Sequence, residues 1–183
     1  MTEMHILWYM KSTAQNNKSL TIQDIALIGI MTATLEAGKL ALSFLPNIEI
    51  VSLFIILYTL FFGRKTIYAI YTFVIIEGCL YGFGIWWIMY LYVWPLLALL
   101  TWCFRKHAAP LPYAILSGVF GLFFGALCAI PYLFIGGWSM AFSWWIAGIP
   151  YDIIHCVANF ILCLFLFKPL HQVLKMVSRS IPV

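Results

Sequence analysis

The sequence predicts an all-α fold, namely a polytopic membrane protein built as a compact bundle of six transmembrane helices. Of its 183 residues, 64% are hydrophobic and only 9% are charged, and the mean hydropathy is +1.01. This composition lies outside the range of soluble globular domains. The apolar residues also fall into runs broken by charge, proline or glycine, and most runs approach the ~20 residues that a helix needs to cross a bilayer.

Six runs are predicted to span the membrane, and the loops between them leave no room for a soluble domain. The runs cover residues 20–45, 48–62, 66–81, 85–104, 111–135 and 143–167. The second and third are short, at about 15 residues, so either burial inside the bundle or local thinning of the bilayer has to accommodate them. The loop at 46–49 is expected to fold partly into the mouth of the bundle as a lid.

Lysine and arginine predict the orientation, because cytoplasmic loops retain cations that are hard to translocate. The cations precede the first span and follow the second, fourth and sixth, and only Lys39 breaks this pattern. Both termini are therefore predicted to be cytoplasmic, with an N-terminal segment at 1–19, a transmembrane domain at 20–167 and a C-terminal tail at 168–183. Because the basic residues form no stripe, the net charge of +4 is interpreted as a topology signal and no nucleic-acid partner is expected.

Four ionisable residues lie inside predicted spans: Glu36, Lys39, Glu77 and Asp152. A charged group at this depth costs several kcal/mol unless it is paired or wetted. At ~1.5 Å rise per residue, all four fall in the outer half of the bilayer, although they come from three different helices. We therefore predict that they line an outward-facing site for a small molecule. For Glu36 and Lys39 a simpler alternative stays open, since residues three apart on one helix can neutralise each other.

The sixth span adds two polar residues to this predicted site. His155 and Asn159 share one helix face with Asp152, at steps of three and four residues. We expect Asp152 and His155 to contact the ligand, because a carboxylate that faces a cavity costs less than one in a dry helix seam. Asn159 has an alternative role as a hydrogen-bonding contact between helices.

Aromatic residues complete the predicted site. Trp87, Tyr90 and Trp94 share one face of the fourth span, and Tyr81 ends the third. Trp94 lies too deep for the aromatic belt at the membrane interface. Together with Tyr81 and Tyr90 it is predicted to stack on a planar or cationic ligand, with ordinary aromatic packing as the alternative.

Two rows of small residues indicate close helix packing. Small side chains at every fourth position let another helix backbone approach closely. The row on the first span consists of Gly29, Ala33, Ala37 and Ala41, and its partner helix is either internal or in another subunit. The row on the fifth span contains Gly121 and Gly125 and is predicted to pack internally. The five cysteines show no ligand spacing and are interpreted as packing residues.

The motifs that are missing from the sequence limit the chemistry. There is no HExxH, Walker loop, GxSxG or paired metal-ligand spacing, so we expect no ATPase, no metal site and no cofactor. Three carboxylates against one lysine favour a ligand that is cationic or rich in hydrogen-bond donors. Two other functions stay open. One is a self-sufficient carrier or channel, and the other is a membrane enzyme with Asp152 and His155 as an acid/base pair.

Three segments carry a resemblance to a known family: AlaThrLeuGluAla at 33–37, LeuProAsnIleGlu at 45–49 and GluGlyCysLeuTyrGlyPheGly at 77–84. With the six spans and the outer polar site, the chain resembles the substrate-binding S component of energy-coupling factor (ECF) vitamin transporters of bacteria and archaea. The resemblance implies a non-catalytic subunit of the cell membrane that binds a vitamin under its first loop. It then delivers the vitamin by docking on a membrane coupling subunit that carries two ATPases.

The resemblance also assigns a role to the row of small residues on the first span. In the family an Ala-xxx-Ala motif docks the coupling subunit, and Ala33 and Ala37 match that motif. The identity of the vitamin stays open. A thiamine-like, pyridoxamine-like or hydroxymethylpyrimidine-like compound fits the charge argument, and cobalamin, pantothenate and riboflavin are not excluded.

Overall fold

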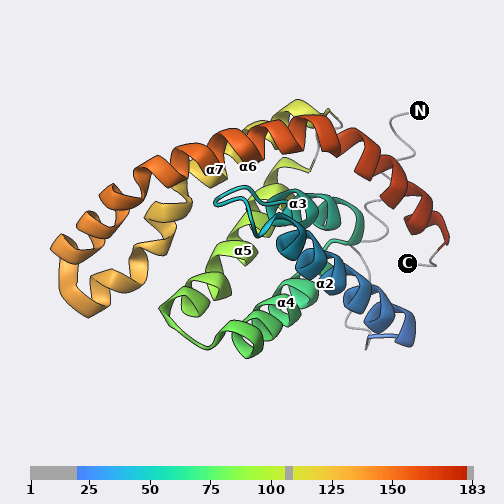
Figure 1. Cartoon of the computed structure of the whole chain (residues 1–183). Helices are drawn as coiled ribbons and strands as arrows, with labels where there is room; N and C mark the ends of the chain where they lie inside the picture. The colour runs from blue at the N-terminus through green and yellow to red at the C-terminus, as the bar shows by residue number, and fades with distance from the viewer. Residues whose placement is uncertain (1–19, 106–108, 181–183) are drawn as a thin grey trace.

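The computed structural model describes residues 20–105 and 109–180 (Figure 1). This part of the chain forms six helices and no strand, which confirms the predicted all-α fold. They are α2 (Ile22–Leu42), α3 (Val51–Phe62), α4 (Lys65–Tyr81), α5 (Ile85–Phe104), α6 (Pro110–Cys128) and α7 (Ile130–Ser180). Helices α2, α5, α6 and α7 are long and apolar enough to cross a membrane. The predicted cytoplasmic segment at 1–19 and the last three residues, 181–183, lie outside the described residues.

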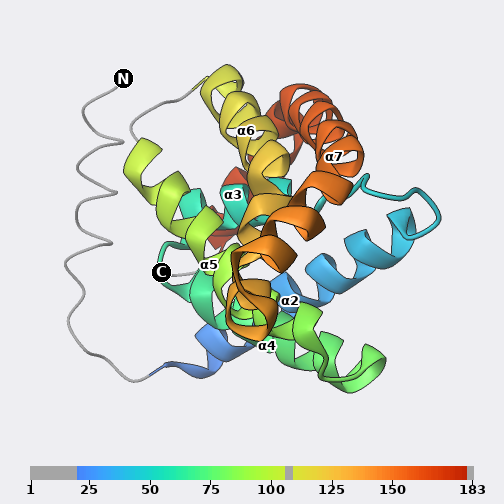
Figure 2. The same cartoon turned by 90° about the vertical axis from the view of Figure 1, so that its left-hand side faces the viewer.

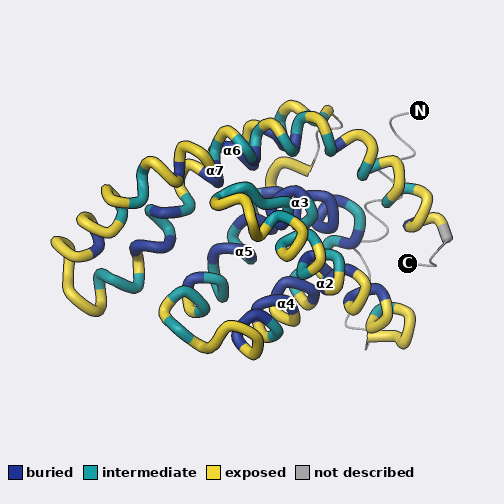
Figure 3. Tube along the Cα trace, viewed as in Figure 1, coloured by how far each residue is buried: buried dark blue, intermediate teal, exposed yellow. Residues whose placement is uncertain are grey.

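Helix α3 lies at the centre of the bundle. Apart from Phe54 and Phe61 its residues are buried, and it contacts α2, α4, α5, α6 and α7. A helix that is apolar on every side requires burial on every side. Figure 3 shows this as an almost continuous buried segment. Of the two ways to accommodate a short second span, the structure shows burial inside the bundle.

Helices α2 and α4 pack side by side and run in the same direction. Near their N-terminal ends, Asp24 Oδ1 and Lys65 Nζ form an ion pair at 2.6 Å. About two turns further along, the Thr32 hydroxyl donates a hydrogen bond to the Ala69 carbonyl at 3.3 Å. Both contacts join residues about 40 positions apart, so the helices are in parallel register. This is the direction expected for the first and third spans of an up-and-down bundle.

Helices α6 and α7 form an antiparallel hairpin whose tip extends away from the other helices (Figure 1). In Figure 2 this tip points toward the viewer. The predicted fifth span, 111–135, is divided in the structure, because α6 ends at Cys128 and Pro131 follows in the first turn of α7. Helix α7 is interrupted at Gly136 and Gly137, directly after the end of the predicted fifth span. Gly137 has a φ of 73°, a conformation that favours glycine, and α7 changes direction there.

Beyond this break, α7 is longer than the predicted sixth span. The segment from 138 to 180 is about 60 Å long at ~1.5 Å per residue, against ~30 Å for the hydrocarbon core of a bilayer. It therefore continues through much of the predicted tail. Lys168 and Pro169 end the apolar run but not the helix, because Leu170 and Leu174, one turn apart, still pack against the core. A proline inside a helix kinks it without necessarily ending it.

Candidate functional site

The structure separates the predicted site residues into two groups. Lys39, Glu77, Tyr81 and Tyr90 border an open cavity between α2, α4 and α5. Asp152, His155 and Asn159 lie instead on the buried face of α7. Trp87 and Trp94, on α5, do not border the cavity.

The first group surrounds a cavity of about 260 Å³, here called the outer cavity. Its walls are Lys39, Glu77, Tyr81, Trp86 and Tyr90. The parallel packing of α2 and α4 brings the C-terminal ends of these two helices together. The short turn after Tyr81 then returns the chain to the start of α5, with Gly82 at a φ of 88°.

Lys39 is held by one carboxylate and two aromatic rings. Its ammonium group forms an ion pair with the Glu77 carboxylate. The same nitrogen lies 5.0 Å from the ring centroid of Tyr81 and 5.6 Å from that of Tyr90, within the range of cation–π attraction. The Lys39 side chain keeps 30% of its surface exposed, whereas that of Glu77 is completely buried. Glu77 Oε1 has no hydrogen-bond partner among the described residues.

Glu36 lies one turn before Lys39 but is not its ion-pair partner. The possibility that these two residues neutralise each other is therefore not the arrangement observed, since Lys39 pairs across to α4. Both carboxylate oxygens of Glu36 are buried and lack a hydrogen-bond partner in the described part of the chain. Helix α2 thus carries a second carboxyl group, three residues before Lys39, whose oxygens have no hydrogen-bond partner among the described residues.

The two tryptophans predicted for the site have packing roles. The Trp87 indole donates a hydrogen bond to the Val74 carbonyl at 2.8 Å and joins α5 to α4. Trp94 is 3% exposed and packs against the rings of Tyr90, Phe120 and Phe124. For Trp94 the structure thus corresponds to the alternative of ordinary aromatic packing.

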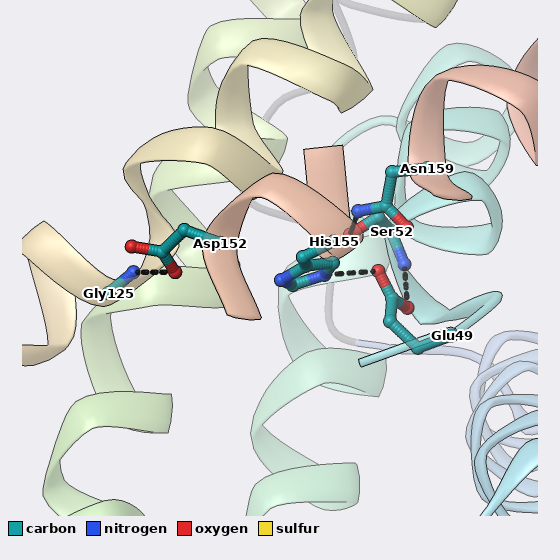
Figure 4. A network of polar contacts seen from close by, with 6 residues as sticks. All are labelled: Glu49, Ser52, Gly125, Asp152, His155 and Asn159. Carbon is teal, nitrogen blue, oxygen red and sulfur yellow. Dashed lines mark hydrogen bonds and ion pairs between the residues drawn. The ribbon is translucent and has the colours of Figure 1, made fainter. Parts of the chain in front are cut away.

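The second group is a polar network that joins the loop before α3 to α7 (Figure 4). His155 Nε2 lies 3.2 Å from Glu49 Oε1. The Ser52 amide donates to Glu49 Oε2 at 2.8 Å, and Asn159 Nδ2 donates to Ser52 Oγ at 3.3 Å. Asn159 therefore has the interhelical role that the sequence left as an alternative.

Glu49 is a member of this network that the sequence prediction missed. Burial alone would raise the pKa of its carboxyl group, but hydrogen bonds and charge from His155, together with hydrogen bonds from Ser52, outweigh burial. The net result is a pKa below the ordinary value, so Glu49 is ionised at neutral pH. The signal that pointed to it was the expected folding of the loop at 46–49 into the mouth of the bundle.

Asp152 does not orient His155, because it binds the neighbouring helix instead. The Gly125 amide donates to Asp152 Oδ1 at 2.9 Å, and Oδ2 is buried without a partner among the described residues. A Cβ on Gly125 would lie 2.3 Å from Oδ2, and one on Gly121 would lie 2.9 Å from the His155 backbone. Only glycine allows this approach, which confirms that the row on the fifth span packs internally.

A line of aromatic rings connects the two groups. Tyr90 at the outer cavity packs on Trp94 with ring centroids 5.4 Å apart, and Trp94 packs on Phe124 at 5.6 Å. Phe124 in turn contacts the His155 ring at 4.9 Å. Packed aromatic rings therefore lie between the outer cavity and the polar network.

The small-residue row on α2 faces outward. Gly29, Ala33, Ala37 and Ala41 are all exposed in the structure. A Cβ added to Gly29 would meet no atom within 4 Å. No helix in the described part of the chain covers this row, so a partner on it would have to be another molecule.

No family model, curated protein or solved structure matches the chain. The geometry of the two groups is thus the basis for assigning a function.

Proposed function

We propose that this chain is the membrane-embedded substrate-binding subunit of an ECF-type importer of bacteria or archaea. It binds a small vitamin-like molecule that is cationic or rich in hydrogen-bond donors, and it is not an enzyme. The observation that carries the proposal is the outer cavity, which combines a buried carboxylate, a lysine and aromatic walls where α2, α4 and α5 meet.

The cavity suits a guest with one or two rings. Its volume of about 260 Å³ lies just under the ~300 Å³ at which pockets for drug-sized ligands begin. Tyr81, Trp86 and Tyr90 offer ring faces for stacking, and Glu77 offers an acceptor whose second oxygen is unpartnered. Such a site binds a planar ligand and fixes its orientation through one polar group.

Delivery of the guest needs a second component, because the sequence has no ATPase motif. The exposed row on α2 is a smooth surface on which another transmembrane helix can pack closely. In this proposal the row docks a membrane coupling subunit that is driven by two ATPases. The family resemblance of Ala33 and Ala37 supports the same assignment.

The test is retention of radiolabelled vitamins by the purified chain in lipid nanodiscs. We expect one vitamin of the panel to be retained, and retention to fall at least tenfold in Glu77→Gln and in Tyr81→Leu. Ala147→Leu, an exposed position on α7, is the matched control and should bind as the wild type does. If no vitamin of the panel is retained at micromolar concentration, the proposed function is wrong.

A second measurement separates this function from that of a self-sufficient carrier. The chain alone, reconstituted in liposomes, should bind the retained vitamin without accumulating it in the lumen. Accumulation without ATPase partners would identify a carrier instead.

A further inference from the structure

The Lys39 ammonium group occupies the position that a cationic ligand would take in the outer cavity. Proteins bind ammonium ligands by placing the charge over aromatic faces, with a carboxylate nearby. Here Lys39 Nζ lies over the rings of Tyr81 and Tyr90 and pairs with Glu77. The aromatic and acidic groups therefore already form a cation site, and a side chain of the same protein fills it.

The two sides of this ion pair differ in their freedom to move. Glu77 is completely buried, in the last turns of α4, and its carboxylate stays with the cavity wall. Lys39 is near the end of α2, is 30% exposed, and ends a flexible four-carbon side chain. The cation can thus leave while the site that holds it remains.

A second acceptor for Lys39 is available on its own helix. Glu36 is three residues earlier, a spacing at which side chains on a helix surface meet. Both of its oxygens are buried and without a hydrogen-bond partner among the described residues. A lysine displaced from Glu77 would therefore reach an acceptor that needs a partner.

The charges of the three residues lead to the same conclusion. A carboxyl group that is buried without a partner is unfavourable at bilayer depth unless it takes up a proton, and Lys39 is already paired with Glu77. A guest with one positive charge replaces Lys39 at Glu77, and the displaced Lys39 then pairs with the ionised form of Glu36. A neutral or anionic guest supplies no cation for Glu77.

We propose that Lys39 is an internal occupant of the cation site, which a monocationic ligand displaces from Glu77 and transfers to Glu36. This inference rests on the proposed function and specifies its substrate class. The ligand carries a single positive charge on a pyridinium, aminopyrimidinium or ammonium group. That group pairs with Glu77 and lies against the faces of Tyr81 and Tyr90.

The first experiment uses 1-methylpyridinium as the probe and measures its affinity for the chain in nanodiscs by calorimetry. We expect Lys39→Met to bind the probe roughly tenfold more tightly than the wild type, because the internal competitor is gone. Glu36→Gln should weaken binding in the wild type but have no effect in the Lys39→Met background, where no lysine needs an acceptor. Benzoate, which has a similar ring and a negative charge, should not bind.

The proposal is overturned if Lys39→Met binds 1-methylpyridinium more weakly than the wild type, since Lys39 would then help to hold the ligand. It is also overturned if the two proteins bind the probe equally tightly, since Lys39 would then not compete with the ligand. Failure of Lys39→Met to bind the probe at millimolar concentration also overturns it. Gel filtration and thermal unfolding show whether each variant is folded before its affinity is interpreted.

A second experiment needs no variant for its main result. In protein labelled with ¹³Cε-lysine, the Lys39 methylene signal should be shifted upfield by the two tyrosine rings. Saturation with 1-methylpyridinium should move it toward the position of the other lysines, and Lys39→Arg assigns the signal by its loss. A Lys39 signal that does not move at saturation contradicts displacement.

The two proposals fail separately. If the probe binds and displaces Lys39 but no vitamin is retained, the cation site stands and the vitamin-binding function is wrong. If a vitamin is retained while Lys39→Met weakens its binding, the function stands and the displacement mechanism is wrong.

Discussion

At the scale of single residues, two contacts of buried or partly buried carboxylates join different segments of the bundle. Lys39 of α2 pairs with Glu77 of α4, and Glu49 of the loop before α3 pairs with His155 of α7. Because charges interact strongly in a poorly solvated interior, each pair is also a link that holds two segments together. Breaking a pair should thus affect stability as well as binding.

The first prediction concerns Glu49→Gln. We expect this change to lower the free energy of unfolding by about 1–3 kcal/mol at pH 7, the range for a buried hydrogen bond to a charged group. The pKa of Glu49 is lowered in the folded state, so its ionised form stabilises the protein at neutral pH. This contribution is complete above the unfolded pKa of about 4.5 and is lost as the pH falls through the lower folded pKa.

The measurement is thermal unfolding of the wild type and of Glu49→Gln in the same detergent between pH 7 and pH 3. The difference between the two midpoints should be largest at neutral pH and should shrink below about pH 4.5. Acidic groups common to both proteins cancel in this difference. A difference that stays constant over the whole range would show that the ionised form of Glu49 does not stabilise the fold.

The buried ionisable residues Lys39 and Glu77 were predictable from the sequence, but their pairing was not. The cost of a charge at bilayer depth identified Lys39 and Glu77 without any structure. That Lys39 selects Glu77 over Glu36 depends on the parallel register of α2 and α4, which no local pattern contains. Glu49 and Ser52 were missed because the search for buried charge was confined to the middle of apolar runs.

At the scale of helices, α6 and α7 pack closely against each other. Gly118, Gly121 and Gly125 form one face of α6, and backbone or side-chain atoms of α7 lie within 3.3 Å of where each Cβ would be. In a membrane, helix association depends on such close packing and on interhelical hydrogen bonds. The hydrogen bond that the Gly125 amide donates to Asp152 is an interhelical bond at a position where the two helices pack closely.

The second prediction is that Gly125→Ala destabilises the hairpin. Its Cβ would lie 2.3 Å from Asp152 Oδ2, so the carboxylate has to move and loses the Gly125 amide. We expect a loss of about 1–3 kcal/mol, the usual cost of overpacking, seen as a lower midpoint of thermal unfolding. Gly148→Ala is the matched control, because a Cβ there meets no atom within 4 Å. Equal midpoints for the two variants would contradict the packing argument.

Helix breaks were more predictable than helix ends. Gly63, the turn at Gly82 and the pair at Gly136–Gly137 all interrupt helices where the sequence predicted a break. Helix α7 continues beyond the end of the predicted sixth span, because hydropathy reports where the apolar run stops and not where backbone hydrogen bonding stops. Past that point, the Leu170 and Leu174 side chains of α7 pack against the core.

At the scale of the whole molecule, the described residues show a polarity along the bundle. The ion pair between Asp24 and Lys65 joins the N-terminal ends of α2 and α4, and the outer cavity lies at their C-terminal ends. The small-residue row on α2 runs between these two ends on the outside. Ligand binding and docking are thus assigned to different surfaces and should be separable by mutation.

The third prediction tests that separation. Replacing both Ala33 and Ala37 by leucine should leave vitamin binding within about twofold of the wild type, because both side chains are exposed and neither borders the cavity. ATP-dependent uptake should fall at least tenfold in cells that co-express an ECF coupling module, because leucine prevents close helix approach. Ala147→Leu is the control for added bulk at an exposed site. Normal uptake by the double variant would show that the row does not dock the coupling subunit.

The fourth prediction concerns orientation in the membrane. If lysine and arginine mark the cytoplasmic side, Ser43 after α2 faces outward and Arg105 after α5 faces the cytoplasm. We expect Ser43→Cys to react with a membrane-impermeant maleimide in intact cells, and Arg105→Cys to react only after permeabilisation. Both positions are exposed. Both labelling variants are made in a protein that also carries Cys79→Ser and Cys103→Ser. These two are the exposed cysteines among the described residues, and the other three are at least partly buried.

The reverse labelling pattern would place the outer cavity on the cytoplasmic side. A binding subunit for import could not collect its substrate there, so the proposed function would fail even if the cavity bound a vitamin. Labelling of both positions in intact cells would instead indicate that the chain inserts in two orientations. Only the pattern with Ser43→Cys outside and Arg105→Cys inside allows the Lys39 site to meet a substrate arriving from outside the cell.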